Sequence, residues 1–102
     1  MRGDSNRNVC GLWDLLHILC GKEETVRIEE AIIASRAELE SATRKFGPFL
    51  SLHEGHSVIE EEFDELWDEI KRLGPHGCDA KLKHEATQLA AMALRFLVDL
   101  CE

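Results

Sequence analysis

Aromatic residues are scarce in this chain of 102 residues, where they make up 6% of the composition and tyrosine is absent. This scarcity leaves little material for a β-sandwich, and no alternating strand pattern is found. Ala, Leu, Glu, Lys and Arg, by contrast, recur at helical spacing. A chain of this length supports one hydrophobic core. We therefore predict a single all-α domain.

Basic residues are also few, because 12 Lys and Arg stand against 20 Asp and Glu, for a net charge of -8. Binding to nucleic acid or to an anionic membrane requires clustered cations, so neither is an expected partner. No apolar run approaches the roughly 20 residues that a membrane-spanning helix needs. The four cysteines lack the CxxC spacing of a zinc site, which favours reduced thiols and a cytoplasmic location.

The apolar periodicity predicts four helical segments. A short helix at residues 10–20 belongs to an N-terminal extension, residues 1–22, and the helical domain follows at residues 23–102. Within that domain a long helix runs from Glu23 to Phe46 and ends at Gly47-Pro48. A loop through residues 53–56 then leads to Ser57, which fits the N-cap of a second helix ending near Leu73.

Asp79 is the predicted N-cap of the last helix, which runs from Ala80 to the C-terminus. Each long helix has an apolar face; these faces comprise Ile28, Ile32, Ser35, Leu39, Ala42 and Phe46, then Ile59, Phe63, Leu66, Trp67, Ile70 and Leu73, and finally Leu82, Ala86, Leu89, Ala93, Phe96, Leu97 and Leu100. The first long helix has a second apolar side with Val26, Ile33 and Ala37. We therefore expect a helical bundle completed by oligomerisation, as a homodimer or homotetramer.

Acidic residues crowd the second helix. Seven carboxylates lie between Glu60 and Glu69, without a basic residue before Lys71. Like charges three or four residues apart destabilise a helix, so a bound cation would relieve this repulsion. Glu62, Glu65 and Glu69 flank the apolar stripe, whereas Asp64 and Asp68 point to the far side. A merely solvated helix face is the alternative interpretation of the run.

A second polar pair lies on the last helix. Glu85 and Gln88 stand beside its apolar face, one turn apart. If the two helices pack antiparallel, Glu62 and Glu65 face Glu85 and Gln88. An oxygen-rich site of this kind suits Mg²⁺ or Mn²⁺.

The run Glu61-Glu62-Phe63-Asp64-Glu65 resembles the EExxE element of the MazG-like all-α nucleotide pyrophosphohydrolases, and Glu85-Ala86-Thr87-Gln88 resembles their ExxD element, with Gln in place of Asp. Residues 45–49, His53-Glu54-Gly55 and residues 85–96 are also similar to small MazG-like proteins often found in phages. The resemblance covers residues 40–102.

This resemblance implies a Mg²⁺-dependent hydrolase that cleaves a nucleoside or deoxynucleoside triphosphate into the monophosphate and pyrophosphate, in nucleotide housecleaning. Glu62, Glu65 and Glu85 would bind the metal, and Glu61 would assist as a base, so that these four form the catalytic set. Gln88 can offer a carbonyl oxygen to the metal but no charge.

Three further residues are the expected substrate contacts: His53, because its predicted loop leads into the acidic helix, and Lys83 and Arg95 as nearby cations. The alternative function is a non-catalytic helical protein of the same fold, in which the carboxylates bind metal for stability and an apolar face binds a partner. Turnover that depends on the carboxylates distinguishes the enzyme from this binding protein.

Overall fold

The computed structural model describes residues 23–101, and the predicted short helix at residues 10–20 lies outside them. The described part contains three helices and no strand, which confirms the all-α prediction. These helices are α3 (Glu24–Phe46), α4 (Leu52–Leu73) and α5 (Ala80–Leu100). None of them is both long enough and sufficiently apolar to span a bilayer.

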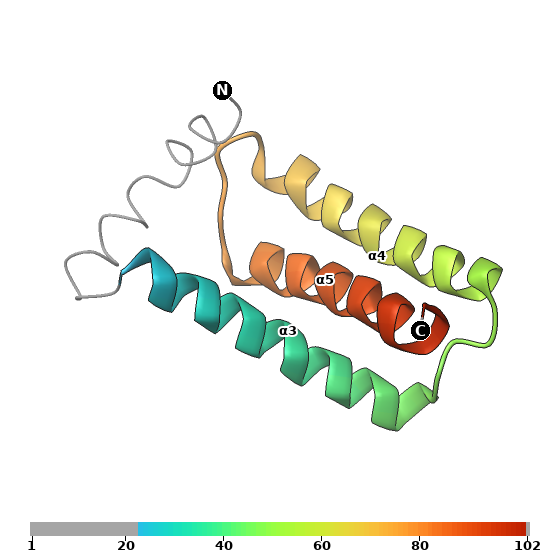
Figure 1. The fold of residues 1–102 in the computed structure, drawn as a ribbon. Helices are drawn as coiled ribbons and strands as arrows, with labels where there is room; N and C mark the ends of the chain where they lie inside the picture. The colour runs from blue at the N-terminus through green and yellow to red at the C-terminus, as the bar shows by residue number, and fades with distance from the viewer. Residues whose placement is uncertain (1–22, 102) are drawn as a thin grey trace.

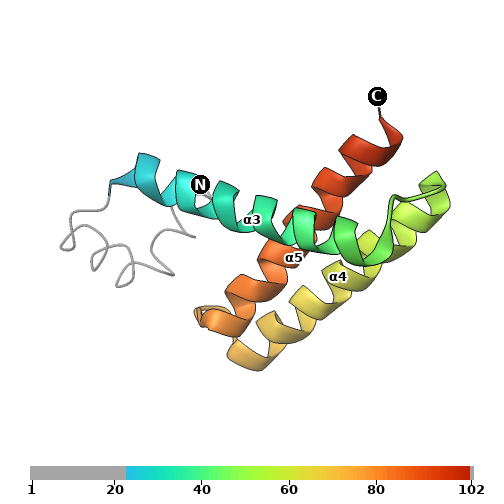
Figure 2. The same ribbon diagram turned by 90° about the horizontal axis from the view of Figure 1, so that it is seen from below.

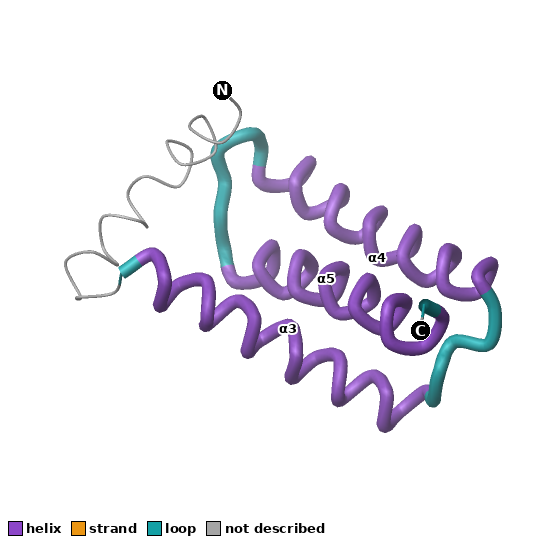
Figure 3. Tube along the Cα trace, in the orientation of Figure 1, coloured by secondary structure: helices purple, strands orange, loops and turns teal. Residues whose placement is uncertain are grey.

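Helix α5 lies between the other two helices (Figures 1 and 3). It packs against α4 along an antiparallel pair and against α3 at an oblique crossing (Figure 2). Because the crossing involves the C-terminal half of α3, the opposite half of that helix extends away from the pair. The core is small and consists of Ala42, Phe49, Ala91 and Met92, with Leu39, Val58, Ile59, Phe96 and Leu100 packed around it.

Several residues that were predicted to be buried are exposed instead. Phe46 is 75% exposed, and Phe63 and Trp67 on α4 are at least half exposed. Ile28 and Ile32 lie on the half of α3 that no other described helix covers. No large side chain within residues 23–101 is completely buried. Three helices with one central member therefore cover only part of the apolar surface that the sequence provides.

The start of α4 differs from the sequence prediction. The helix begins at Leu52, so His53 and Gly55 are helical and Ser57 is not its cap. Ser51 is the N-cap, and its hydroxyl accepts a hydrogen bond from the Glu54 backbone N–H at 3.1 Å. The Glu54 carboxylate in turn accepts from the Leu50 N–H at 2.6 Å. This reciprocal capping stabilises the first turn and outweighs the low helix propensity of Gly55.

The last helix begins as predicted. Asp79 is its N-cap, and its carboxylate accepts from the Leu82 N–H at 2.9 Å. The two preceding helices end at Gly47 and Gly74, whose φ angles of 71° and 83° are strained for residues with a side chain. Both chain reversals therefore depend on glycine.

Gly55 permits the close approach of α4 and α5. A Cβ atom at this position would lie 2.6 Å from the Phe96 ring and 3.1 Å from Leu100. We expect Gly55→Ala to destabilise the fold by about 1 kcal/mol, because the overlap with the ring exceeds the gain in helix propensity. Urea unfolding followed by circular dichroism measures this change. Ser57→Ala, at an exposed position of the same helix, is the control, and a Gly55→Ala variant as stable as this control contradicts the packing.

Candidate functional site

Three carboxylates from two helices meet beside the core. Glu62 and Glu65 lie one turn apart on α4, and Glu85 lies on α5. One carboxylate oxygen from each residue lies within 4.8 Å of the others. The antiparallel packing of the two helices produces this arrangement, because it places the second half of α4 beside the first half of α5.

The pKa of Glu62 is raised. Burial is the largest cause, followed by the negative charges of Glu65, Glu85 and Glu61, and together they raise this pKa from the ordinary 4.5 to about 7. One Glu62 oxygen is buried without a hydrogen-bond partner. A buried oxygen that lacks a donor, beside two other carboxylates, is suited to a hard divalent cation. The residues present therefore fit such an ion.

A cleft of about 580 Å³ opens beside Glu62, between α3, α4 and α5. Its polar lining includes Glu61, Glu62 and Gln88, together with Glu38 and Lys45 from α3. Its apolar lining includes Ala42, Phe49, Val58 and Met92. A cleft lined by carboxylates, a lysine and apolar side chains can accommodate a ligand that has both phosphate groups and a flat ring.

Glu38 and Lys45 are among the residues of this cleft that were not identified as site residues from the sequence. Glu38 and Lys45 belong to the first long helix, which was interpreted only as a packing element. The signal is present, because Ser35, Glu38, Ala42 and Lys45 recur at steps of three and four and so lie on one helix face. A carboxylate and a lysine on that face, beside a small alanine, indicate a polar cavity rather than a continuous apolar seam.

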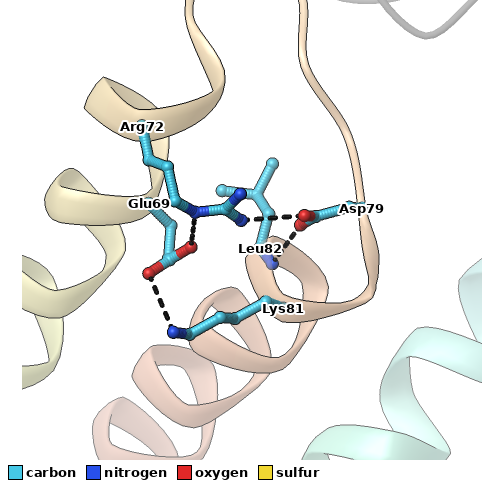
Figure 4. A network of polar contacts seen from close by, with 5 residues as sticks. All are labelled: Glu69, Arg72, Asp79, Lys81 and Leu82. Atoms are coloured by element: carbon cyan, nitrogen blue, oxygen red, sulfur yellow. Dashed lines mark hydrogen bonds and ion pairs between the residues drawn. The ribbon is translucent and has the colours of Figure 1, made fainter.

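Glu69 does not join the acidic group, although its position flanking the apolar stripe had suggested it. Its carboxylate forms ion pairs with Arg72 at 2.7 Å and with Lys81 at 3.5 Å (Figure 4). Arg72 forms a second ion pair, with Asp79 at 2.8 Å. Hydrogen bonds from Arg72 and from the Leu82 backbone lower the pKa of Asp79. This network fastens the end of α4 to the start of α5, so Glu69 has a structural role.

The three predicted substrate contacts lie in different places. His53 is helical and lines a separate apolar hollow of about 760 Å³, whose other lining residues are Leu52, His56, Ile59, Ala93, Phe96 and Leu97. Lys83 is exposed on α5 and does not line the acidic cleft. Neither residue therefore lines the cleft beside Glu62.

Arg95 does line the cleft, but it is only 4% exposed and its guanidinium is already engaged. It donates to the Gly47 carbonyl and to the Met92 sulfur at 3.7 Å, and it stacks 4.2 Å from the centre of the Phe49 ring. Asp99 lies 4.0 Å from Arg95 and accepts from the Phe49 N–H at 2.9 Å. Arg95, which belongs to α5, thus holds the α3–α4 connection against that helix.

No protein-family model, curated protein or solved structure matches this chain. What the site can do is therefore inferred from its own geometry and charge.

The raised pKa of Glu62 predicts a pH-dependent stability. The folded chain holds this proton more tightly than the unfolded chain does. The stabilising contribution of Glu62 to the free energy of unfolding is therefore fully present below about pH 4.5 and is lost as the pH rises through about 7. We expect Glu62→Gln to be more stable than the wild type at pH 8 and the difference to shrink towards pH 4.5. Thermal unfolding in chelator across this range measures it. Glu60→Gln, at an exposed position, is the control, and a pH-independent difference contradicts the assignment.

Proposed function

We propose that this protein is a Mg²⁺-dependent nucleoside triphosphate pyrophosphohydrolase of the MazG-like type, acting on ribo- or deoxynucleotides. The observation that carries the proposal is the convergence of Glu62, Glu65 and Glu85 from two helices, with Glu62 also lining a cleft. The resemblance of residues 61–65 and 85–88 to the two acidic elements of that family supports it. Mn²⁺ is an alternative ion, since carboxylate ligands suit both.

The reaction is the attack of water on the α-phosphorus, which breaks the bond to the β-phosphate and releases pyrophosphate. Mg²⁺, when bound, neutralises the charge on the phosphate oxygens. Glu62, Glu65 and Glu85 would hold the ion, and Gln88 would offer an amide oxygen. Glu61 lines the same cleft and would be the base that accepts a proton from the attacking water. Lys45, which lines the cleft, would be the cation for the substrate phosphates.

The exposed apolar surface supports an oligomer. Val26 and Ile33 lie on the second apolar side of α3 and are 43% and 65% exposed. Large exposed aliphatic side chains on one helix are typical of subunit interfaces. The proposal therefore includes a homodimer or homotetramer in which a second subunit covers α3.

A non-catalytic protein that binds metal through the same carboxylates is the competing function. Gln88 favours it, because an amide lowers the charge of the group around the ion. The two functions differ in turnover, since both predict metal binding and only the enzyme predicts pyrophosphate release.

We expect Glu65→Gln and Glu85→Gln each to reduce pyrophosphate release by at least about 100-fold, because each removes a charged ligand from the site. The measurement is pyrophosphate release from a panel of ribo- and deoxynucleoside triphosphates with Mg²⁺ or Mn²⁺. The matched control is Glu60→Gln, an exposed acid on the same helix. Wild-type protein that is folded and binds Mn²⁺ but hydrolyses none of the panel would support the non-catalytic alternative.

The oligomer is tested separately. We expect Ile33→Glu to dissociate it while leaving the helical content unchanged, since a charge within a buried interface lacks a partner. Sedimentation velocity measures the mass. Ala34→Glu, a quarter turn away on the same helix, is the control. A monomeric wild type contradicts this part of the proposal without affecting the hydrolase assignment.

A further inference from the structure

One hydrogen bond crosses the acidic cleft from α5 to α3. The Gln88 amide nitrogen donates to the Glu38 carboxylate at 3.1 Å, and it lies 3.2 Å from Nε2 of His84. An amide nitrogen has two hydrogen atoms, so an unprotonated Nε2 on His84 uses the second of them. The amide oxygen is then the end of the Gln88 side chain that remains for a cation.

The charges explain why an amide is suitable at this position. Glu38 is half-buried and lines the same cleft as Glu61 and Glu62. A glutamate at position 88, which has the same length as glutamine, would set two carboxylates against each other at about the same separation, in a partly buried place where their repulsion is strong. An amide instead donates to Glu38. Position 88 on α5 therefore carries no negative charge, and the nearby carboxylate is that of Glu38 on α3.

We propose that Glu38 is a positioning residue of the cation site: with His84 it fixes the orientation of the Gln88 amide, and it supplies the negative charge that Gln88 does not. The inference rests on the proposed metal binding by Glu62, Glu65 and Glu85. The role of Glu38 extends the proposed metal site, because it adds a residue of α3 to a site otherwise built from α4 and α5. The acid and the amide form the Glu38–Gln88 pair. The two side-chain types in this pair can be exchanged between the two helices.

The exchange is tested first without metal. In chelator, we expect Gln88→Glu to lower the thermal unfolding midpoint by several degrees, because a hydrogen bond becomes a contact between like charges. The double variant Glu38→Gln/Gln88→Glu should recover most of the loss, since the amide on α3 then donates to the carboxylate on α5. Equal midpoints for the single and double variants would overturn the proposal.

The second test is Mn²⁺ binding to the full chain by titration calorimetry. We expect Glu38→Gln to weaken binding roughly tenfold, as loss of an outer partner of a metal ligand does, and the double variant to return to within a few-fold of the wild type. Glu40→Gln is the matched control: it removes the same charge from the same helix, where Glu40 pairs with Arg36 at 3.4 Å on the surface.

The outcomes separate this inference from the function on which it rests. If the wild type binds Mn²⁺ and Glu38→Gln binds it as tightly as Glu40→Gln, Glu38 has no role at the site and the proposal falls alone. If the wild type binds no Mn²⁺, the metal site and the role of Glu38 fall together. Weakened binding in Glu38→Gln, with recovery in the double variant, establishes the Glu38–Gln88 pair.

Discussion

The buried guanidinium of Arg95 is the interaction on which the arrangement of the three helices depends. It joins the Gly47 carbonyl and the Phe49 ring to α5, and Asp99 holds the Phe49 backbone from the same helix. The connection from α3 to α4 is thereby fixed to the middle helix. Because that connection limits where α3 can cross α5, the contacts of Arg95 support the crossing at which Glu38 meets Gln88.

The two ends of the α4 and α5 pair are held by different chemistry. At one end, apolar contact between Gly55 and Phe96 brings the helices close. At the other end, the ion pairs of Glu69 with Arg72 and Lys81 and of Arg72 with Asp79 join them. The carboxylates Glu62, Glu65 and Glu85 lie between these two attachments. Like charges can therefore be held close together, because the repulsion among them is opposed on both sides.

Much of the fold could be predicted from the sequence because helix ends carry local signals. Asp79 with Ala80 and the Gly-Pro steps after Phe46 and Leu73 depend only on neighbouring residues, and these boundaries agree with the structure. The start of α4 was predicted wrongly because Gly55 suggested a loop. Its helical conformation is explained by a contact with Phe96, which is distant in sequence. The exposure of Phe46 and Trp67 was missed for a similar reason, since periodicity does not say how many helices cover a face.

For the site, the meeting of Glu62, Glu65 and Glu85 follows from helical spacing once an antiparallel pair is assumed. The contribution of α3 does not, because Glu38 comes 50 residues before Gln88 and their contact depends on the crossing of two helices. Arg95 illustrates a different case. It was interpreted as a substrate contact because it is a cation near the acidic segment, and it does line the cleft. The sequence did not show that it is buried and bonded to the α3–α4 connection, which gives it a structural role.

The oblique crossing makes α3 a lever with its pivot near Ala42. The N-terminal end of the helix lies about 27 Å from that pivot and Glu38 only about 6 Å, at a rise of about 1.5 Å per residue. A rotation of about 10° would thus move the far end by about 5 Å but Glu38 by about 1 Å. A partner seated on the far half can change its angle considerably, while the residues that face the cleft keep nearly the same positions.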